Sequence, residues 1–247
     1  MRIVISGTVG VGKSTVSSQL VKEFIKQKYE VNFLNEETVD SIYLDFYYKK
    51  PYDWAFLAQL DFLFGRFKQW LIDEKKRSNL TIEKNKKYIT VYDRHFLDDY
   101  VFAELHTIKQ NISNFNSITY QAIYKELSDK MNKLKAKPDF FFLLKANLDV
   151  IVERLKGRGR SEELDVSLEY WKDLYKNYYI RPTFKNHFQQ NVINFVEINT
   201  NNKTSEEVVK EILNYISNNY DYSFNEAIEK KQLENNNINT FKNTILN

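Results

Sequence analysis

The chain contains no cysteine and only six glycines among its 247 residues. The absence of cysteine excludes disulfide bonds, thiolate metal sites and catalysis by a cysteine nucleophile. No apolar run approaches the length of about 20 residues that a membrane-spanning helix needs, so we expect a soluble protein without membrane partners. Because the chain starts directly with a strand pattern, we also expect no signal peptide and a cytoplasmic location.

A large excess of one charge is missing as well. The 36 basic residues are nearly balanced by 33 acidic ones, which leaves a net charge of +3, and both signs are interspersed along the chain. Nucleic-acid partners are therefore not expected, because they call for a concentrated basic surface. The content of 43% hydrophobic and 15% aromatic residues is sufficient for a sizeable core in one α/β domain.

The few glycines are unevenly distributed. Gly7, Gly10 and Gly12 form one cluster, and Gly157 and Gly159 form a second. In a chain so poor in glycine, such clusters indicate places where the backbone must come close to another group. We predict that this group is phosphate.

The first cluster has the spacing of a phosphate-binding loop. The apolar run 3–5 precedes it and an amphipathic stretch follows, which is the strand, glycine turn and helix that such a loop requires. Its backbone amides and the helix N-terminus would bind the phosphates of ATP, Lys13 would reach the β- and γ-phosphates, and the Ser14 hydroxyl would ligate Mg²⁺. The predicted ATP-binding residues here are Gly7, Thr8, Val9, Gly10, Val11, Gly12, Lys13, Ser14 and Thr15.

Strand-like and helix-like patterns alternate along most of the chain. The strand-like runs cover 2–6, 31–34, 88–92, 139–145 and 192–198, and the helix-like patterns cover 14–28, 52–76, 97–112, 119–135, 147–156, 164–180 and 204–217. This alternation predicts an α/β fold of the P-loop kinase type, with a five-stranded parallel sheet and helices on both faces. We expect one domain over 1–217 and a polar tail, rich in Asn and Lys, over 218–247.

Polar residues that suit phosphoryl transfer follow the predicted strands, where ligands of such sheets collect. Asp93, after the third strand, can hold Mg²⁺ through its water shell, and Arg94 can reach the transferred phosphoryl group. The alternative for this pair is an ordinary surface ion pair. The second glycine cluster lies among basic residues that would form a closing arginine lid over ATP, with a solvated charge run as the alternative. These residues are Arg154, Arg158 and Arg160.

In this order, the motifs resemble those of the deoxynucleoside kinase family, which includes deoxycytidine, deoxyguanosine and deoxyadenosine kinases. The resemblance covers most of 1–217. It implies transfer of a phosphoryl group from ATP, with Mg²⁺, to the 5′-hydroxyl of a deoxynucleoside, and a homodimeric enzyme. It also implies that Glu36 is the catalytic base, acting with Lys13 and Arg94. The family commonly has proline after this glutamate, so Glu37 is the alternative base.

The resemblance further assigns residues to the nucleoside. The segment 48–59 resembles the family's substrate helix, where Tyr48 would bind the sugar 3′-hydroxyl and Gln59 would pair with the base. By the residues alone, Gln59 is equally well explained as a hydrogen-bonded core amide. The resemblance places Arg66 and Asp99 near the exocyclic group of the base and brings Glu163, in the lid, to the sugar. His95 stands where the family usually has a small hydroxyl residue.

An Asp–Arg pair at the base edge favours adenine, cytosine or guanine over thymine, because it can accept from an amino group and donate to a ring nitrogen. We predict a purine-preferring enzyme, with deoxyadenosine first, since the pair and the segment 158–163 most resemble bacterial deoxyadenosine kinases. One alternative is a thymidylate kinase, which would need a further cationic site for the acceptor's phosphate. The other is a non-catalytic P-loop nucleotide-binding module, although the segment 85–88 lacks the acid of the guanine-reading pattern.

Overall fold

The computed structural model describes residues 1–35, 41–80, 88–158 and 166–220, without the side chains of 48, 80 and 158. Its five strands are all parallel and form one sheet in the order β2-β3-β1-β4-β5. The strands are β1 (Arg2–Ser6), β2 (Glu30–Leu34), β3 (Tyr88–Asp93), β4 (Phe140–Lys145) and β5 (Asn194–Asn199). The first strand is therefore central, and its carboxyl end opens into the glycine turn.

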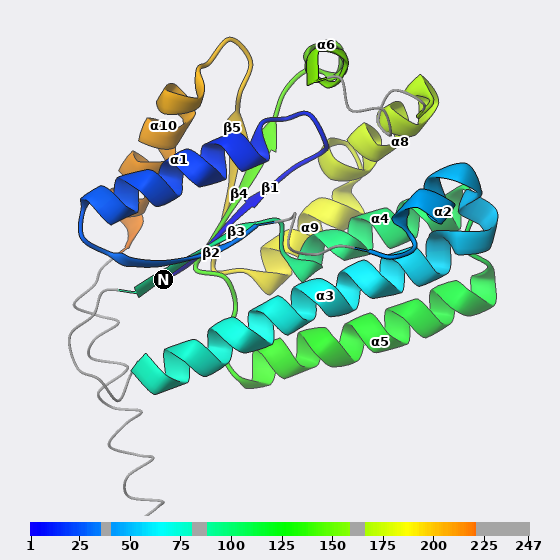
Figure 1. Cartoon of the computed structure of the whole chain (residues 1–247), viewed down its shortest axis with the longest axis horizontal. Helices are drawn as coiled ribbons and strands as arrows, with labels where there is room; N and C mark the ends of the chain where they lie inside the picture. The colour runs from blue at the N-terminus through cyan, green and yellow to red at the C-terminus, as the bar shows by residue number, and fades with distance from the viewer. Residues whose placement is uncertain (36–40, 81–87, 159–165, 221–247) are drawn as a thin grey trace, which may run out of the picture.

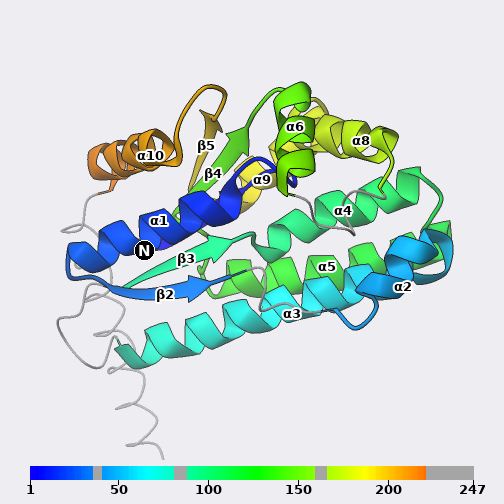
Figure 2. The ribbon, with the colours of Figure 1, turned by 45° about the horizontal axis from the view of Figure 1, so that its top comes forward.

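Helices cover both faces of this sheet. Helices α1 and α10 lie against one face, and α3, α4 and α5 lie against the other (Figure 1). Figure 2 shows the same layers from a second direction, with α6 and α8 near the carboxyl ends of the central strands. The bounds are α1 (Lys13–Lys26), α2 (Leu44–Lys49), α3 (Pro51–Leu80), α4 (Phe96–Ile108), α5 (Asn114–Lys133), α6 (Leu148–Arg158), α8 (Leu168–Tyr179), α9 (Pro182–Asn191) and α10 (Ser205–Asn219). The predicted α/β architecture is confirmed.

The burial of the central strands explains why their sequences lack polar alternation. Residues 3–5 of β1 and 140–144 of β4 are at most 1% exposed. A parallel sheet covered by helices on both faces needs apolar side chains on both sides of each strand, so these strands read as continuous apolar runs. The edge strand β2 is only half-buried and is correspondingly more polar.

The sequence prediction was wrong about two helices. It missed α2, whose six residues are too few for a helical period, and α9, which follows only two residues after α8 and begins at Pro182. It also started α5 five residues late, because the cap was overlooked. The Ser113 side chain accepts a hydrogen bond from the Asn116 backbone amide at 3.2 Å, and this starts the helix.

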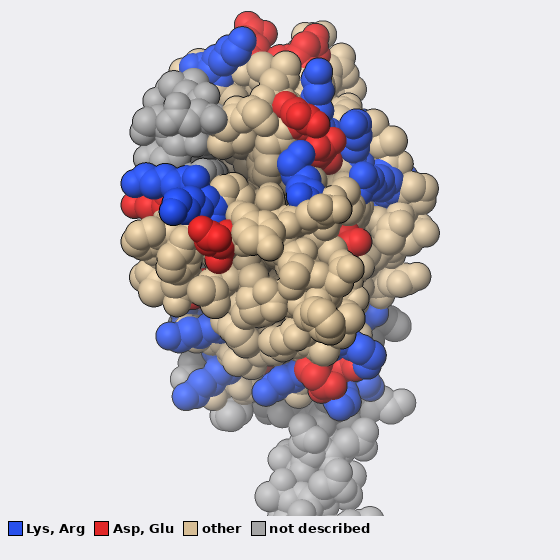
Figure 3. All heavy atoms as spheres, turned by 90° about the vertical axis from the view of Figure 1, so that its right-hand side faces the viewer, with Lys and Arg blue, Asp and Glu red and all other residues tan. Residues whose placement is uncertain are grey.

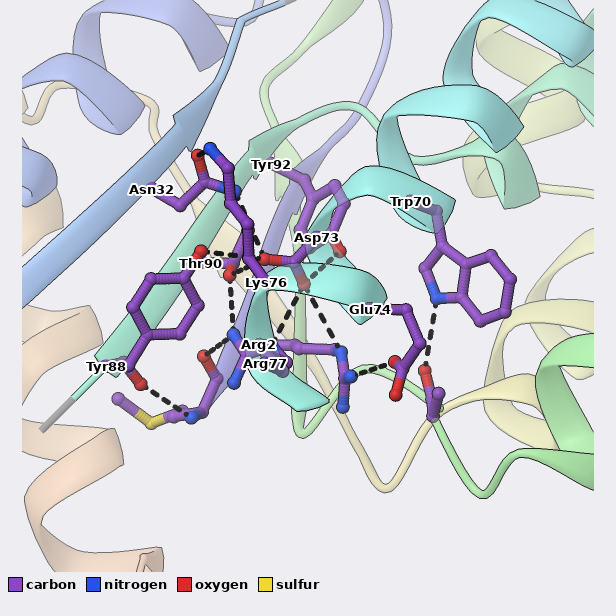
Figure 4. Close-up of polar contacts among 12 residues, drawn as sticks. Arg2, Asn32, Trp70, Asp73, Glu74, Lys76, Arg77, Tyr88, Thr90 and Tyr92 are labelled. Atoms are coloured by element: carbon purple, nitrogen blue, oxygen red, sulfur yellow. Dashed lines mark hydrogen bonds and ion pairs between the residues drawn. The ribbon is translucent and has the colours of Figure 1, made fainter. Parts of the chain in front are cut away.

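A buried polar cluster joins α3 to the sheet, on the side away from the glycine turn (Figure 4). Its centre is the Asp73 carboxylate, which is fully buried and forms ion pairs with Arg77 at 2.9 Å and Arg2 at 3.5 Å. Burial alone would raise the pKa of Asp73, but the charge of Arg77 and hydrogen bonds to the carboxylate outweigh it and lower the pKa to about 2. Further donors come from the two neighbouring strands, namely Asn32, Tyr88, Thr90 and Tyr92.

The surface of the molecule shows mixed charge. Figure 3 looks at the end where α2 and the starts of α3 and α5 lie, and on this face basic and acidic side chains are interspersed around a mostly uncharged centre. This agrees with the small net charge of the chain. Among the described residues, every helix is too short or too polar to cross a bilayer.

Candidate active site

The glycine turn between β1 and α1 has a backbone that only glycine adopts without strain. Gly7 has φ of 136° and Gly10 has φ of 81°. A Cβ atom on Gly7 would lie 2.5 Å from the carbonyl oxygen of Leu144, and one on Gly10 would lie 2.9 Å from Cγ of Leu155. Glycine is therefore required at these two positions, where the loop packs directly against β4 and α6.

Helix α1 starts within this loop, and its amino end is free of negative charge. Gly12 is the N-cap, and the first turn contains no acidic residue. The backbone amides of the first turn and the helix dipole therefore favour an anion at this point. Lys13, only 6% exposed, donates from Nζ to the carbonyl oxygen of Thr8 at 2.9 Å, so its ammonium group lies over the loop. Of the nine predicted residues, 7–12 thus form the turn between β1 and α1, and 13–15 form the first turn of α1.

A tyrosine that the sequence analysis missed fastens this loop to the sheet. The hydroxyl of Tyr179, at the end of α8, accepts a hydrogen bond from the Thr8 amide at 3.1 Å and donates to the Leu144 carbonyl at 2.7 Å. Burial raises the pKa of Tyr179, so the hydroxyl keeps the proton that it donates. No local pattern could have indicated this contact, because 171 residues separate Thr8 from Tyr179.

The predicted Asp93–Arg94 pair lies beside the loop. Asp93 ends β3 in register with Ile5 of β1, two residues before the glycine turn. Arg94 follows with φ of 68°, a conformation that costs energy for a residue other than glycine, and its side chain is 2% exposed. Its Nη1 donates to the Tyr178 hydroxyl at 2.8 Å, and its guanidinium lies 5.0 Å from the ring centre of Phe102. This pair is therefore not the surface ion pair of the alternative reading.

Asp98 organises these groups from the first turn of α4. Its Oδ1 accepts hydrogen bonds from Ser6 and from Tyr178 at 2.9 Å, and lies 3.9 Å from Nη1 of Arg94. Its Oδ2 accepts from the His95 amide at 3.1 Å, which completes a capping box for α4. The sequence analysis missed Asp98, although an acid three residues after the N-cap residue is part of the signal of such a box.

His95 caps α4 in place of the family's small hydroxyl residue. Its Nδ1 lies 3.4 Å from the Leu97 amide, and the ring packs on Phe96 at 4.4 Å between centres. Burial, and secondarily the charge of Arg2, lowers the pKa of His95 to about 3. A neutral imidazole can accept from the amide, so the substitution preserves a helix cap.

The structure brings together the two residues predicted for the base edge. Arg66 on α3 and Asp99 on α4 form a buried ion pair, with the side chains 6% and 1% exposed. The Arg66 guanidinium also lies 5.2 Å from the ring centre of Phe62. Gln59, 4% exposed, precedes Arg66 by seven residues, or about two turns, on the same side of α3. A donor, an acceptor and an amide thus lie on neighbouring helices near the end of β3.

The first of the predicted lid arginines contacts the glycine loop. Arg154 on α6 donates to the Thr200 side chain at 3.1 Å, to the Thr200 carbonyl at 3.0 Å and to the Val11 carbonyl at 3.4 Å. Its proposed contact with ATP phosphates stays a prediction. The side chains of Arg158 and Tyr48 lie outside the described residues, as do Gly159, Arg160, Glu163, Glu36 and Glu37.

The family model described as deoxynucleoside kinase matches residues 3–220. The chain belongs to the deoxynucleoside kinase family. It is 30% identical over 176 residues to a deoxyguanosine kinase of Bacillus subtilis (strain 168), a match that covers 71% of this chain and 75% of the relative. It is also 30% identical over 177 residues to a deoxyadenosine/deoxycytidine kinase of the same organism, covering 71% and 74%.

A solved structure supports the same assignment. Deoxyadenosine kinase from M. mycoides with bound dATP superposes with a TM-score of 0.68 at 28% identity, covering 88% of this chain and all of that one. Membership of this enzyme family favours the predicted deoxynucleoside kinase over the two alternatives, a thymidylate kinase and a non-catalytic nucleotide-binding module.

Proposed function

We propose that this deoxynucleoside kinase transfers the γ-phosphoryl group of ATP to the 5′-hydroxyl of a purine deoxynucleoside, with deoxyadenosine as the preferred acceptor. The observation that supports the base preference is the buried Arg66–Asp99 pair. The carboxylate can accept from the adenine amino group and the guanidinium can donate to a ring nitrogen, and a buried pair left unsatisfied penalises the wrong base. The similar deoxyadenosine kinase from M. mycoides has been solved with bound dATP and also with bound dCTP, which agrees with a base edge that takes an amino group.

The experiment that tests this proposal measures kcat/KM for ATP-dependent phosphorylation of the four deoxynucleosides, with dTMP as a fifth acceptor. We expect deoxyadenosine to be the best substrate and thymidine the poorest. A clear preference for thymidine would overturn the base-edge argument. Turnover of dTMP without turnover of any nucleoside would instead support a thymidylate kinase.

Different residues bind the phosphates, accept the proton and stabilise the transferred group. Loop amides and Lys13 hold the β- and γ-phosphates, where the amino end of α1 favours negative charge. Glu36 accepts the proton of the 5′-hydroxyl as its oxygen attacks the γ-phosphorus in line, and Arg94 stabilises the charge on the moving group. Tyr178 and Asp98 fix the Arg94 guanidinium before substrate arrives, which avoids reorganisation during the reaction.

Two residues at the carboxyl ends of the strands could hold Mg²⁺. Ser14 in the first turn of α1 and Asp93 at the end of β3 supply a hydroxyl and a carboxylate oxygen, the ligand type that Mg²⁺ prefers. Among the described residues, no group of three His, Cys, Asp or Glu side chains could hold a metal by itself, so the remaining ligands would be phosphate oxygens and water. When bound, Mg²⁺ neutralises charge on the phosphates.

Replacing Glu36 by Gln should lower kcat by about 10²–10⁴-fold, because the general base is lost. Binding of deoxyadenosine, measured by calorimetry, should change little, since the amide has the same shape. Glu37→Gln is the matched control and should keep most of the activity. If Glu37→Gln abolished turnover while Glu36→Gln left it unchanged, the base would be Glu37.

We also propose a homodimer. Helices α3 and α5 lie side by side and carry apolar side chains that are 39–85% exposed, namely Leu57, Phe64, Phe115 and Ile118. Such an exposed apolar area on a soluble domain indicates an interface. Light scattering should give twice the 29.6 kDa of one chain, and Phe64→Glu should yield monomers. Lys22→Glu, an exposed change on α1, should remain dimeric.

A further inference from the structure

Helix α2 buries one tyrosine against the rest of the domain. It has only six residues, and Tyr47 is the only one of its described side chains that is buried, at 6% exposure. Asp45, Phe46 and Lys49 are exposed. A helix this short has little stability of its own, so its position depends on such packing contacts. They include those of Tyr47 and of Phe46, whose ring centre lies 5.1 Å from that of Trp54 on α3. The next residue, Tyr48, is the one that the family resemblance assigns to the sugar.

The Tyr47 hydroxyl belongs to a directed chain of hydrogen bonds. His106 on α4 lies with Nε2 at 2.8 Å from this hydroxyl, and its Nδ1 lies 3.2 Å from Nδ2 of Asn111. An amide nitrogen can only donate, so Nδ1 accepts and the ring hydrogen is on Nε2, which donates to Tyr47. The Tyr47 proton then points to the hydroxyl of Tyr170 on α8, 3.3 Å away. One imidazole thus links α2, α4 and α8.

The surroundings keep His106 in this single state. The ring is 1% exposed, and burial, followed by the charge of Lys109, lowers its pKa to about 4. It is therefore neutral at pH 7, with one hydrogen to donate. The Tyr47 and His106 rings are nearly perpendicular, at 89° with centres 5.1 Å apart, so packing restricts the imidazole as well.

We propose that His106 is a positioning residue for the nucleoside, holding Tyr47, and through it the backbone of α2 that carries Tyr48, where the sugar binds. This inference rests on the proposed function. His106, in the last turn of α4, is predicted to act on acceptor binding and to leave the ATP site, which lies near the first turn of α4, unaffected. No feature of the sequence pattern singled out His106 or Tyr47.

The test compares steady-state kinetics of His106→Leu and His106→Gln with the wild type, using ATP and deoxyadenosine. We expect His106→Leu to raise the KM for deoxyadenosine about tenfold, with less than a twofold change in the KM for ATP. Gln, whose Nε2 can replace the imidazole donor, should restore most of the loss. Tyr47→Phe should raise the same KM, and adding it to His106→Leu should have little further effect.

The chain contains a matched control in a second buried tyrosine–histidine pair. His187 on α9 lies 2.9 Å from the Tyr124 hydroxyl, and its pKa is also lowered to about 4 by burial. His187→Leu should cost similar thermal stability but leave the KM for deoxyadenosine unchanged. Equal effects of the two leucine variants on this KM, or none in His106→Leu and Tyr47→Phe, would overturn the proposal. A wild type that phosphorylates no nucleoside would instead refute the proposed function.

Discussion

Replacing Lys13 by alanine is expected to reduce kcat by about 10³-fold or more. The side chain is 6% exposed and its Nζ lies over the loop, 2.9 Å from the Thr8 carbonyl, where the phosphates of ATP would displace that contact. Cationic groups that stabilise the moving phosphoryl group have effects of this size, because catalysis in this reaction class is almost entirely positioning and charge stabilisation. The measurement is single-turnover phosphorylation of deoxyadenosine at saturating ATP.

The control for this variant is Lys22→Ala. Lys22 lies on the same helix, α1, but is exposed and outside the first turn, so its removal should leave kcat within about twofold. Thermal melts of both variants would show that α1 remains folded. If Lys13→Ala retained wild-type turnover, the glycine turn would not be the ATP site.

Replacing Asp73 by asparagine is expected to destabilise the protein by about 3–5 kcal/mol, because Arg77 would keep a buried charge without the carboxylate that pairs with it, whereas Arg2 would retain its ion pair with Glu74. For a chain of this size, that loss corresponds to a fall in Tm of about 6–20 °C. Equilibrium unfolding in urea would measure it. Asp129→Asn is the matched control, since the Lys125–Asp129 pair is exposed and screened by solvent, and its loss should leave the unfolding midpoint nearly unchanged.

The same carboxylate gives the stability of the protein a defined pH dependence. The pKa of Asp73 is lowered from 3.8 to about 2 in the folded chain. Its charge therefore stabilises the fold above pH 3.8, and this contribution, on the order of 2 kcal/mol, is lost as the pH falls from 3.8 towards 2. The wild type should lose more stability over this window than Asp73→Asn does. Equal losses would mean that Asp73 is not a paired carboxylate.

Much of the architecture could be predicted because the spacing of apolar residues along the sequence reflects it. Continuous apolar runs predicted β1 and β4, since strands buried on both faces have no polar side. The loop at 7–15 was predicted because its function requires glycine at positions of positive φ, and the chain has few other glycines. Helices α2 and α9 could not be found in this way. Helix α2 is shorter than two turns. Helix α9 is separated from α8 by only two residues and begins at Pro182, so the two read as one helical pattern.

The site was partly predictable for the same reason. Residues in contiguous motifs, such as Asp93 and Arg94, were found from their own sequence context. Partners from distant segments were not. Tyr178 and Tyr179 reach Arg94 and the glycine turn from α8, and their burial and contacts depend on how this helix packs. Asp98 lies in the same segment as Arg94 and was missed although its capping-box position marks it.

The sequence by itself determined the fold class, the place of the phosphate loop at the end of the first strand, and membership of the kinase family, because each depends on residues that are close together in the chain. Only the tertiary structure decided which side chains hold the loop, Arg94 and α2 in place. Those contacts join buried polar groups from separate segments. Examples are the Tyr179 hydroxyl with the Thr8 backbone amide and the His106 imidazole with the Tyr47 hydroxyl. A buried polar group needs a hydrogen-bond partner, and the packing of distant segments decides which group that is, so the local sequence does not indicate the partner.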